Sequence, residues 1–168
     1  IQQLENAETV PVVEMLAWAG WDQKKKDVLA SGARLTDHWT VLSVIQGEED
    51  QLYFRRSWLY AEDHSVMGLL LEYVWGEPAF EHDWKTGQQV EATVVFYPAA
   101  FPQRILIESF RTSIRTDVYL LGYPDFHHFG RAYAEALGKN PWLQRFPAIL
   151  EQVRPVKEKD AWGLVDEE

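Results

Sequence analysis

The sequence predicts an α+β domain built on an antiparallel sheet of about five strands, arranged as a meander or a partly closed barrel. N- and C-terminal helices are expected to flank the sheet. Residues 39–110 contain five apolar runs rich in β-branched and aromatic residues, each bounded by turn-forming residues. Helical spacing and capping residues mark the segments on either side. With 168 residues, we predict a single domain over 1–168.

The N-terminal segment, 1–34, is predicted to hold two short helices. Pro11 suits the first turn of a helix that Gly20 would end. Asp22 is expected to cap a second helix that ends at Gly32, because an aspartate accepts from free backbone N–H groups and glycine favours a helix end.

The sheet is predicted to occupy 39–110. Polar turns at 47–50 and 62–65 separate the first three strands. The third strand is apolar on both faces, which places it centrally. In the second strand, Arg55 shares a face with Leu59, whereas Phe54 and Trp58 share the other. The five predicted strands are 39–45, 51–60, 66–75, 88–97 and 104–110.

The corner after the fourth strand gives a specific expectation. Pro98 ends that strand because proline has no N–H for the ladder. A tight link, 99–103, then lets Arg104 begin the neighbouring antiparallel strand. Tyr97 and Arg104 are therefore expected to lie together, with Val94 and Phe96 in the core. Arg104 either locks this corner structurally or binds a ligand, and both interpretations stay open.

The C-terminal segment is predicted to be helical over 125–152. Asp125 is a good cap for a helix ending at Gly138, and Asn140 with Pro141 predicts a second helix. Residues 153–168 read as a hairpin cut off in its second strand. The pattern gives no assignment for 111–124.

Composition excludes several classes of protein. The net charge of −10 opposes binding to nucleic acid or to an anionic membrane, although a local basic patch would still be compatible. The absence of cysteine excludes disulfides, thiolate zinc sites and a cysteine nucleophile. No run reaches membrane-span length, and there is no signal peptide. Because the chain begins at Ile1, we expect a processed chain or a piece of a longer protein.

No catalytic motif is present, so we predict that the chain is not an enzyme and has no cofactor or metal of its own. There is no glycine-rich phosphate loop and no G-x-S-x-G turn. His127 and His128 are adjacent, so they point about 100° apart on a helix and do not form a two-ligand face. The acid–histidine groups at 62–64 and 81–83 fall in predicted turns, where polar residues collect in any protein.

Arginines from the predicted strands form the candidate binding set. If they share a face with nearby tyrosines, they would suit nucleic acid or an acidic peptide. The alternative is that they pair with the many carboxylates of this acidic chain. The candidate binding residues are Arg55, Arg56, Tyr97, Arg104 and Arg111, with Arg115 nearby.

Several stretches together resemble the region downstream of the zinc finger in bacterial SWIM zinc finger family proteins. The most specific are two motifs, FYPAAFPQR from Phe96 to Arg104 and NPWLQRFP from Asn140 to Pro147. The resemblance covers most of 14–166. Weaker matches are EMLAWAGWDQKKKDVLA, TDHWTVLSV, RRSWLY, LLLEYVW and WGLVD.

The resemblance implies a cytoplasmic bacterial protein of uncharacterised role. The family's C-x-C…C-x-H finger is absent here, so zinc is expected only upstream, in a parent protein. Two functions follow as hypotheses. The first is a non-catalytic protein-interaction or structural module with an unidentified protein partner. The alternative is a nucleic-acid-binding accessory domain that uses an arginine and aromatic sheet face. No membrane partner is expected.

Overall fold

The computed structural model describes residues 23–113, 117–159 and 161–166. The chain divides into two compact units, 1–119 and 120–168, here called the barrel unit and the C-terminal unit. The single domain predicted over 1–168 would comprise both units, and it stays a prediction. The helix expected from Pro11 and the candidate Arg115 lie outside the described residues.

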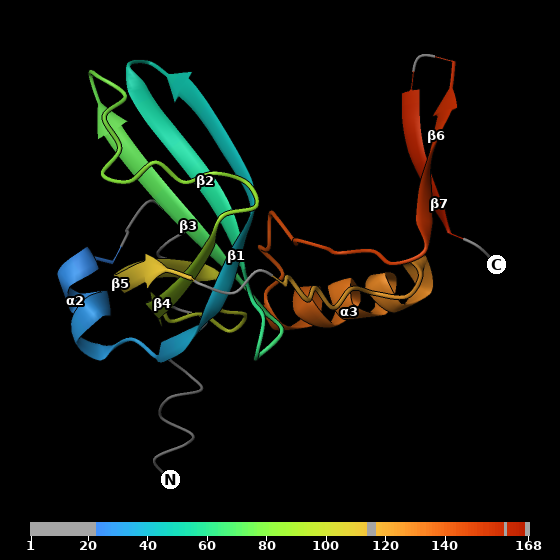
Figure 1. Cartoon of the computed structure of the whole chain (residues 1–168), viewed down its shortest axis with the longest axis horizontal. Helices are drawn as coiled ribbons and strands as arrows, with labels where there is room; N and C mark the ends of the chain where they lie inside the picture. Colours follow the sequence, from blue (N-terminus) through green and yellow to red (C-terminus); the bar gives the residue numbers. More distant parts are fainter. Residues whose placement is uncertain (1–22, 114–116, 160, 167–168) are drawn as a thin grey trace, which may run out of the picture. The chain divides into compact units, whose positions relative to one another are not determined.

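Five strands of the barrel unit close into a ring in the order β1-β2-β3-β5-β4 (Figure 1). Among the described residues, neighbouring strands are antiparallel except β3 and β5, which make a short parallel contact. The five strands and the partly closed barrel are confirmed, whereas the meander is wrong. The long loop 76–88 lets the chain cross, so that β5 lies between β3 and β4. The strands are β1 (Arg34–Glu49), β2 (Leu52–Ala61), β3 (Val66–Trp75), β4 (Gln89–Phe96) and β5 (Arg104–Thr112).

Strand β1 closes the ring because it is long enough to pair on both sides. Its first half pairs with β4 and its second half with β2, and Trp39 lies opposite Ala61 on one side and Val90 on the other. A bulge between Val41 and Ser43 shifts the register. Bulges increase local twist, which a strand needs in order to wrap around a barrel.

The barrel interior is an apolar core centred on Trp39. The indole Nε1 of Trp39 donates to the carbonyl of Ala92 at 3.2 Å, so its polar atom is satisfied. Gly68 of β3 lies against the Trp39 and Ile105 side chains, and a Cβ there would meet both. The other buried members include Val41, Leu59, Leu70, Trp84, Val90 and Val94.

Helix α2 (Lys25–Ser31) covers part of the outer face of β4 and β5 (Figure 1). Its Val28 packs with Val95, Tyr97 and Leu106 in a second, smaller core. The predicted end at Gly32 is confirmed. Glycine is needed there, because a Cβ would collide with two backbone carbonyls.

The C-terminal unit contains α3 (Phe126–Lys139) and a hairpin of β6 (Val153–Glu158) and β7 (Ala161–Asp166). The predicted cap is confirmed, because the Asp125 carboxylate accepts from the His128 N–H at 2.7 Å. The hairpin is also confirmed. A small aromatic cluster is formed by rings that pack against one another, some stacked and others edge-on or tilted: Tyr123, Phe129, Tyr133 and Phe146.

The second C-terminal helix is wrong: a turn and extended chain follow Asn140. Asn140 caps only that turn, through the Trp142 N–H. The chain then pairs with Tyr123, whose N–H donates to the Ile149 carbonyl and whose carbonyl accepts from the Glu151 N–H. Pro147 disfavours a helix before it, so this tertiary pairing prevails over the capping signal.

Candidate functional site

The two arginines of β2 lie on opposite faces of the strand. Arg55 points into the barrel and is 1% exposed, whereas Arg56 lies on the outer face. The neighbouring Ser57 and Leu59 are buried. The interior side of β2 therefore also carries a charge, and Arg55 belongs to no surface that a ligand could reach directly.

Arg55 is held by a carboxylate and a ring. Its Nε donates to Glu72 Oε2 at 2.8 Å, and its Nη2 lies 2.7 Å from the same oxygen. The guanidinium also lies 4.4 Å from the ring centre of Phe80. A buried cation requires such a partner, because an isolated one would cost several kcal/mol in lost solvation.

The predicted contact between Tyr97 and Arg104 is confirmed. The guanidinium of Arg104 lies 4.2 Å from the Tyr97 ring centre, and the Tyr97 N–H donates to the Arg104 carbonyl at 2.9 Å. Strand β4 ends before Pro98, as predicted, and Val94 is fully buried. Tyr97 is 7% exposed and packs under α2, which favours the structural interpretation of this corner.

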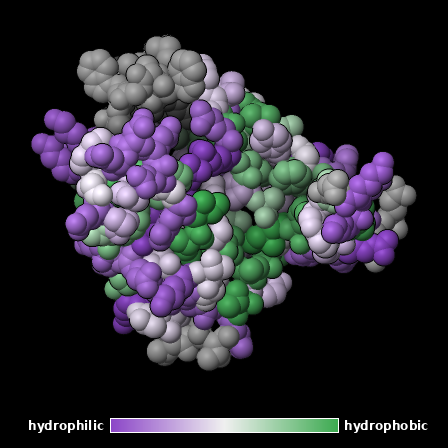
Figure 2. Space-filling view, turned by 90° about the horizontal axis from the view of Figure 1, so that it is seen from above, coloured by the Kyte–Doolittle hydropathy of each residue, from purple (hydrophilic) through white to green (hydrophobic). Residues whose placement is uncertain are grey.

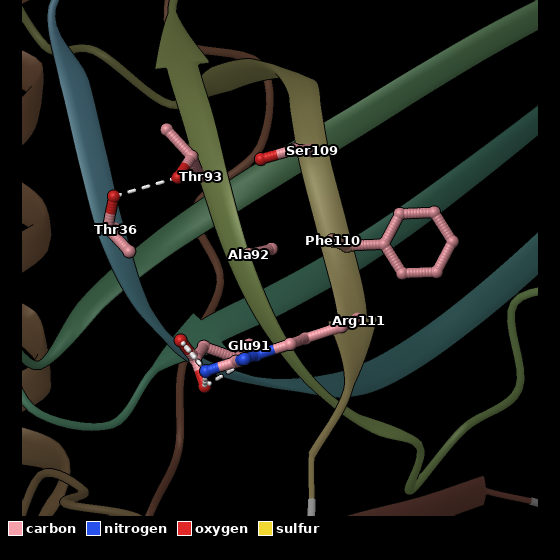
Figure 3. A pocket seen from close by; sticks show the side chains of 7 residues that line it. All are labelled: Thr36, Glu91, Ala92, Thr93, Ser109, Phe110 and Arg111. Carbon is pink, nitrogen blue, oxygen red and sulfur yellow. Dashed lines mark hydrogen bonds and ion pairs between the residues drawn. The ribbon is translucent and has the colours of Figure 1, made fainter.

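Arg111 lies on the outer face of β4 and β5, where its guanidinium forms a bidentate pair with Glu91 at 2.7 Å. Beside this pair is a groove of about 270 Å³. Thr36, Thr93 and Ser109 occupy matching positions on three adjacent strands along it, and Phe110 points away from them (Figure 3). The candidate arginines therefore occupy separate places and form no common basic surface.

A different surface lies on the outer side of β1, β2 and β3. Ile45, Arg56 and Leu71 are paired in one row, and Phe54 and Tyr73 in the next. Trp75 follows at the end of β3. Exposed fractions of 53% for Ile45 and Tyr73 and 69% for Trp75 show that the row is open. We call this surface the sheet patch: Ile45, Phe54, Arg56, Leu71, Tyr73 and Trp75.

Phe54 is fixed within the sheet patch on both of its sides. Its ring lies over Gly47 of β1, where only a hydrogen atom fits. The Arg56 guanidinium stacks on the ring, 4.3 Å from its centre. Hydrophobic residues are visible at the surface in the space-filling view (Figure 2). A large exposed aromatic surface is a common mark of an interaction site.

The β1–β2 turn next to the sheet patch is acidic. Glu48, Glu49 and Asp50 are exposed and end β1 at this turn. Asp50 and Gln51 both have positive φ, at 50° and 65°, which is the backbone of a tight two-residue hairpin turn. We call these three acids the acidic tip.

At the opposite end of β2, Asp37 anchors the 62–65 turn. One carboxylate oxygen accepts from the His38 and Asp63 N–H groups, at 2.5 and 3.0 Å. The other accepts from the His64 N–H at 3.1 Å and lies 2.7 Å from His64 Nδ1. The Asp37 side chain is buried. Its role is to hold the turn between β2 and β3.

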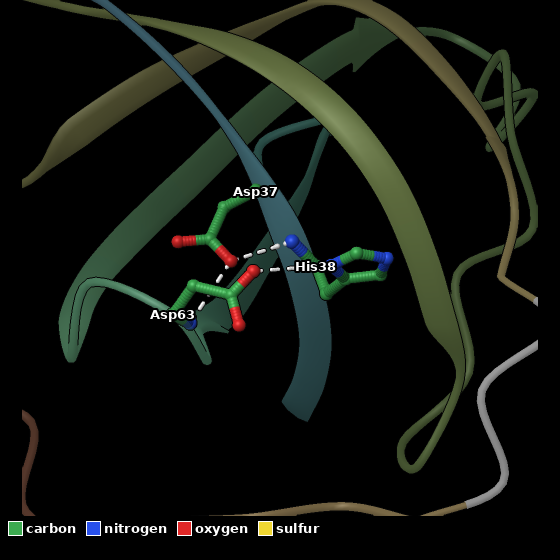
Figure 4. Close-up of side chains that lie close together, drawn as sticks. All are labelled: Asp37, His38 and Asp63. Carbon is green, nitrogen blue, oxygen red and sulfur yellow. Dashed lines mark hydrogen bonds and ion pairs between the residues drawn. The ribbon is translucent and has the colours of Figure 1, made fainter.

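Asp37, His38 and Asp63 are close enough together to be considered as metal ligands. Their donor atoms lie within 4.8 Å of one another, and His38 Nδ1 is 3.2 Å from Asp63 Oδ2 (Figure 4). Both Asp37 oxygens already accept backbone hydrogen bonds, so a cation would have to compete with the turn for them. The geometry therefore fits a structural anchor better than a metal centre.

No family model matches the chain, and no curated protein or solved structure is significantly similar to it. Within the described ranges, no helix is long and apolar enough to cross a membrane.

Proposed function

We propose that the barrel unit is a non-catalytic protein-binding module whose sheet patch accepts an extended, basic and apolar segment of a partner. The observation that carries the proposal is the exposure of Tyr73 and Trp75 beside the half-buried Phe54. Aromatic side chains lose little conformational freedom on binding and bury large areas, so they dominate interface energetics.

The acidic tip favours a basic partner. Glu48, Glu49 and Asp50 lie at the end of the hairpin that presents Phe54, and Arg56 is the cation of the sheet patch. The whole chain carries −10 as well. A segment with lysine or arginine beside its apolar residues would be attracted to this end of the sheet, and its association would slow as salt is added.

Single-stranded nucleic acid is the second candidate. Five-stranded Greek-key barrels of the OB type bind oligonucleotides on the face of strands 2 and 3, and the sheet patch lies mainly on the same strands here. Phe54 stacked with Arg56 would suit a base. The acidic tip and the separation of the arginines oppose phosphate binding, so we place this candidate second.

The proposal extends the resemblance to the SWIM zinc finger family, which remains a prediction. In that reading the module serves a parent protein in the bacterial cytoplasm, and zinc belongs to a finger upstream of Ile1. The module itself would use neither a cofactor nor a metal.

Peptide arrays with matched charges test the proposal. Each apolar core sequence is displayed once with flanking lysine and once with flanking glutamate, and the whole chain is applied at low and high salt. We expect capture by the lysine series alone, weaker at high salt. The double variant Tyr73→Ser/Trp75→Ser should abolish capture, because it removes the two most exposed rings of β3.

The matched control is Trp142→Ser, which removes an exposed tryptophan of the C-terminal unit. This variant should bind like the unaltered chain. Equal capture of both peptide series would contradict a charge-selected partner. Retardation of single-stranded DNA or RNA that Tyr73→Ser/Trp75→Ser eliminates would establish the second candidate in place of the first.

A further inference from the structure

A pocket of about 460 Å³ opens where the barrel is least closed. Strands β3 and β5 pair only through Leu69 with Arg104 and Leu70 with Ile105. Beyond these pairs, residues of both strands line the pocket instead of bonding to each other. We call it the seam pocket. Its volume lies in the range of small-molecule sites, which is about 300–1,000 Å³.

Four parts of the barrel unit build the seam pocket. Strand β3 contributes Leu70 to Glu72, β5 contributes Leu106 to Phe110, and α2 contributes Lys25 and Leu29. The loop between β3 and β4 supplies Glu81, His82 and Trp84. Because these elements are far apart in the sequence, the pocket can form only when the barrel has closed.

An aromatic group forms one part of the lining. The Trp84 and Phe110 rings are 4.9 Å apart, and His82 lies edge-on to Phe110 at 4.8 Å. Trp84 is 3% exposed and belongs to the core, so this part of the pocket is rigid. Aromatic faces attract cations through the negative potential above the ring.

Three carboxylates complete the lining, against one ammonium group from Lys25. Glu72 is oriented by Arg55, and Glu108 by Arg34, whose Nη2 lies 2.9 Å from Glu108 Oε1. Neither arginine is among the described residues that line the pocket, so both act from outside it. Glu81 is the most exposed of the three carboxylates, with 85% of its side chain open. Because Glu72 and Glu108 are each paired with an arginine, Glu81 is the lining carboxylate that would meet an incoming cation.

We propose that the seam pocket binds an alkylammonium or alkylguanidinium cation, with the aliphatic stem against Leu29 and Leu106 and the charge near Glu81. Leu71 lines the pocket and also belongs to the sheet patch. The cation is therefore a lysine or arginine side chain of the segment that lies on the patch. Only this choice of source rests on the proposed function, because the pocket and its charges do not depend on it.

The test uses three probes of four carbon atoms each: n-butylammonium, 1-butanol and butyrate. Amide and indole NMR spectra of the whole chain are recorded during titration with each. Butylammonium should shift the Trp84 indole and the Glu81 and Phe110 amides in a saturable way, 1-butanol should do so only weakly, and butyrate should not. Glu81→Gln should weaken butylammonium binding about two- to fivefold, as expected for an exposed charge pair.

Glu77→Gln is the matched control, because Glu77 is an exposed acid of the same loop that is not among the lining residues. It should leave the affinity unchanged. Equal shifts from 1-butanol or butyrate would overturn the cation selectivity. Absence of saturable shifts at Trp84 and Phe110 would overturn the site.

The source of the cation is settled separately. A captured peptide should lose affinity when its lysine is replaced by norleucine, and Glu81→Gln should remove that difference. In Tyr73→Ser/Trp75→Ser, butylammonium should still bind although the peptide does not. If butylammonium binds but replacing lysine by norleucine leaves the affinity of the peptide unchanged, the ligand of the pocket is a free amine. That result would contradict a peptide side chain as the source of the cation.

Discussion

Arg55 shows how one side chain depends on a single partner. Its guanidinium is inside the barrel, and its charge is met by the Glu72 carboxylate across the β2–β3 ladder. The Phe80 ring covers it. The exposed Arg111–Glu91 pair makes a similar contact at the surface, where water competes for both groups. The buried ion pair and the exposed ion pair are therefore expected to contribute differently to the free energy of unfolding.

We predict that Glu72→Gln destabilises the barrel unit by about 2–4 kcal/mol, because it leaves a buried cation without its counter-charge. Glu91→Gln, the same change in the exposed pair, should cost less than about 1 kcal/mol. Urea unfolding of both variants measures the difference. Equal costs would show that Arg55 does not depend on Glu72.

Part of this arrangement was available from the sequence. Once the turn is placed at 62–65, counting back along both strands sets Arg55 opposite Glu72, which is the observed register. The apolar pattern of β2 was misleading, because Phe54 and Trp58 look like core residues and lie on the outer side. No local signal shows that Asp37 holds the 62–65 turn, since that contact joins residues 26 and 27 positions apart.

Strand β3 can approach β5 because residue 68 is glycine. A Cβ there would lie 2.7 Å from Ile105 Cδ1 and 3.2 Å from Trp39 Cζ3. Both side chains are fully enclosed, so neither can move aside easily. The short parallel contact that completes the ring starts at the next residue, Leu69.

Gly68→Ala should therefore destabilise the barrel unit by about 1–3 kcal/mol, the usual cost of overpacking a core. Gly130→Ala makes the same change inside α3, where the added atom meets open space. It should stabilise the helix by about 0.5–1 kcal/mol, because alanine has the better helix propensity. Hydrogen exchange measured by NMR reports each unit in the same experiment. Stabilisation by both substitutions would contradict the close approach at Gly68.

The start of α3 gives a prediction about pH. The His128 backbone N–H, and then its imidazole, bond to the Asp125 carboxylate and lower its pKa. Because the folded pKa lies below that of the unfolded chain, the cap stabilises the helix fully above about pH 4 and is lost as pH falls through the lowered value. Protection of the His128 amide should fall over that acid range.

Asp125→Asn is the control for this effect, because asparagine caps a helix about as well as aspartate and does not titrate. It should keep α3 folded at neutral pH and remove the acid dependence of the His128 amide. If the amide of this variant loses protection at the same pH as that of the unaltered chain, a group other than Asp125 controls the helix start.

The sequence predicts the strands of the barrel unit better than their order in the ring. Strands end close to turn-forming residues, such as Pro98 and the 62–65 turn, because the local sequence determines where a strand stops. The ring order depends on a loop crossing and on two residue pairs between β3 and β5, for which no pattern exists. The division into two units likewise depends on contacts that no local pattern shows, and the helix predicted after Asn140 is replaced by pairing with Tyr123.

The candidate site was predicted only in part. Tyr97 and Arg104 meet as expected, because a proline and a short link determine that corner. The sheet patch was not recognised, although the alternation of Tyr73 and Trp75 at the end of a strand could have indicated it. Net charge alone could not place the acids, whereas the structure sets Glu48, Glu49 and Asp50 beside the exposed aromatics.

The binding surface is tested directly by an NMR titration of the whole chain with a lysine-flanked apolar peptide taken from the array. We expect saturable shifts confined to the acidic tip and to five residues of the sheet patch, with affinity falling as salt rises. These residues are Ile45, Phe54, Leu71, Tyr73 and Trp75. The glutamate-flanked version should leave these signals in place. Shifts that fall elsewhere in the chain, or an equal response to both peptides, would contradict the assignment of the sheet patch as the binding surface.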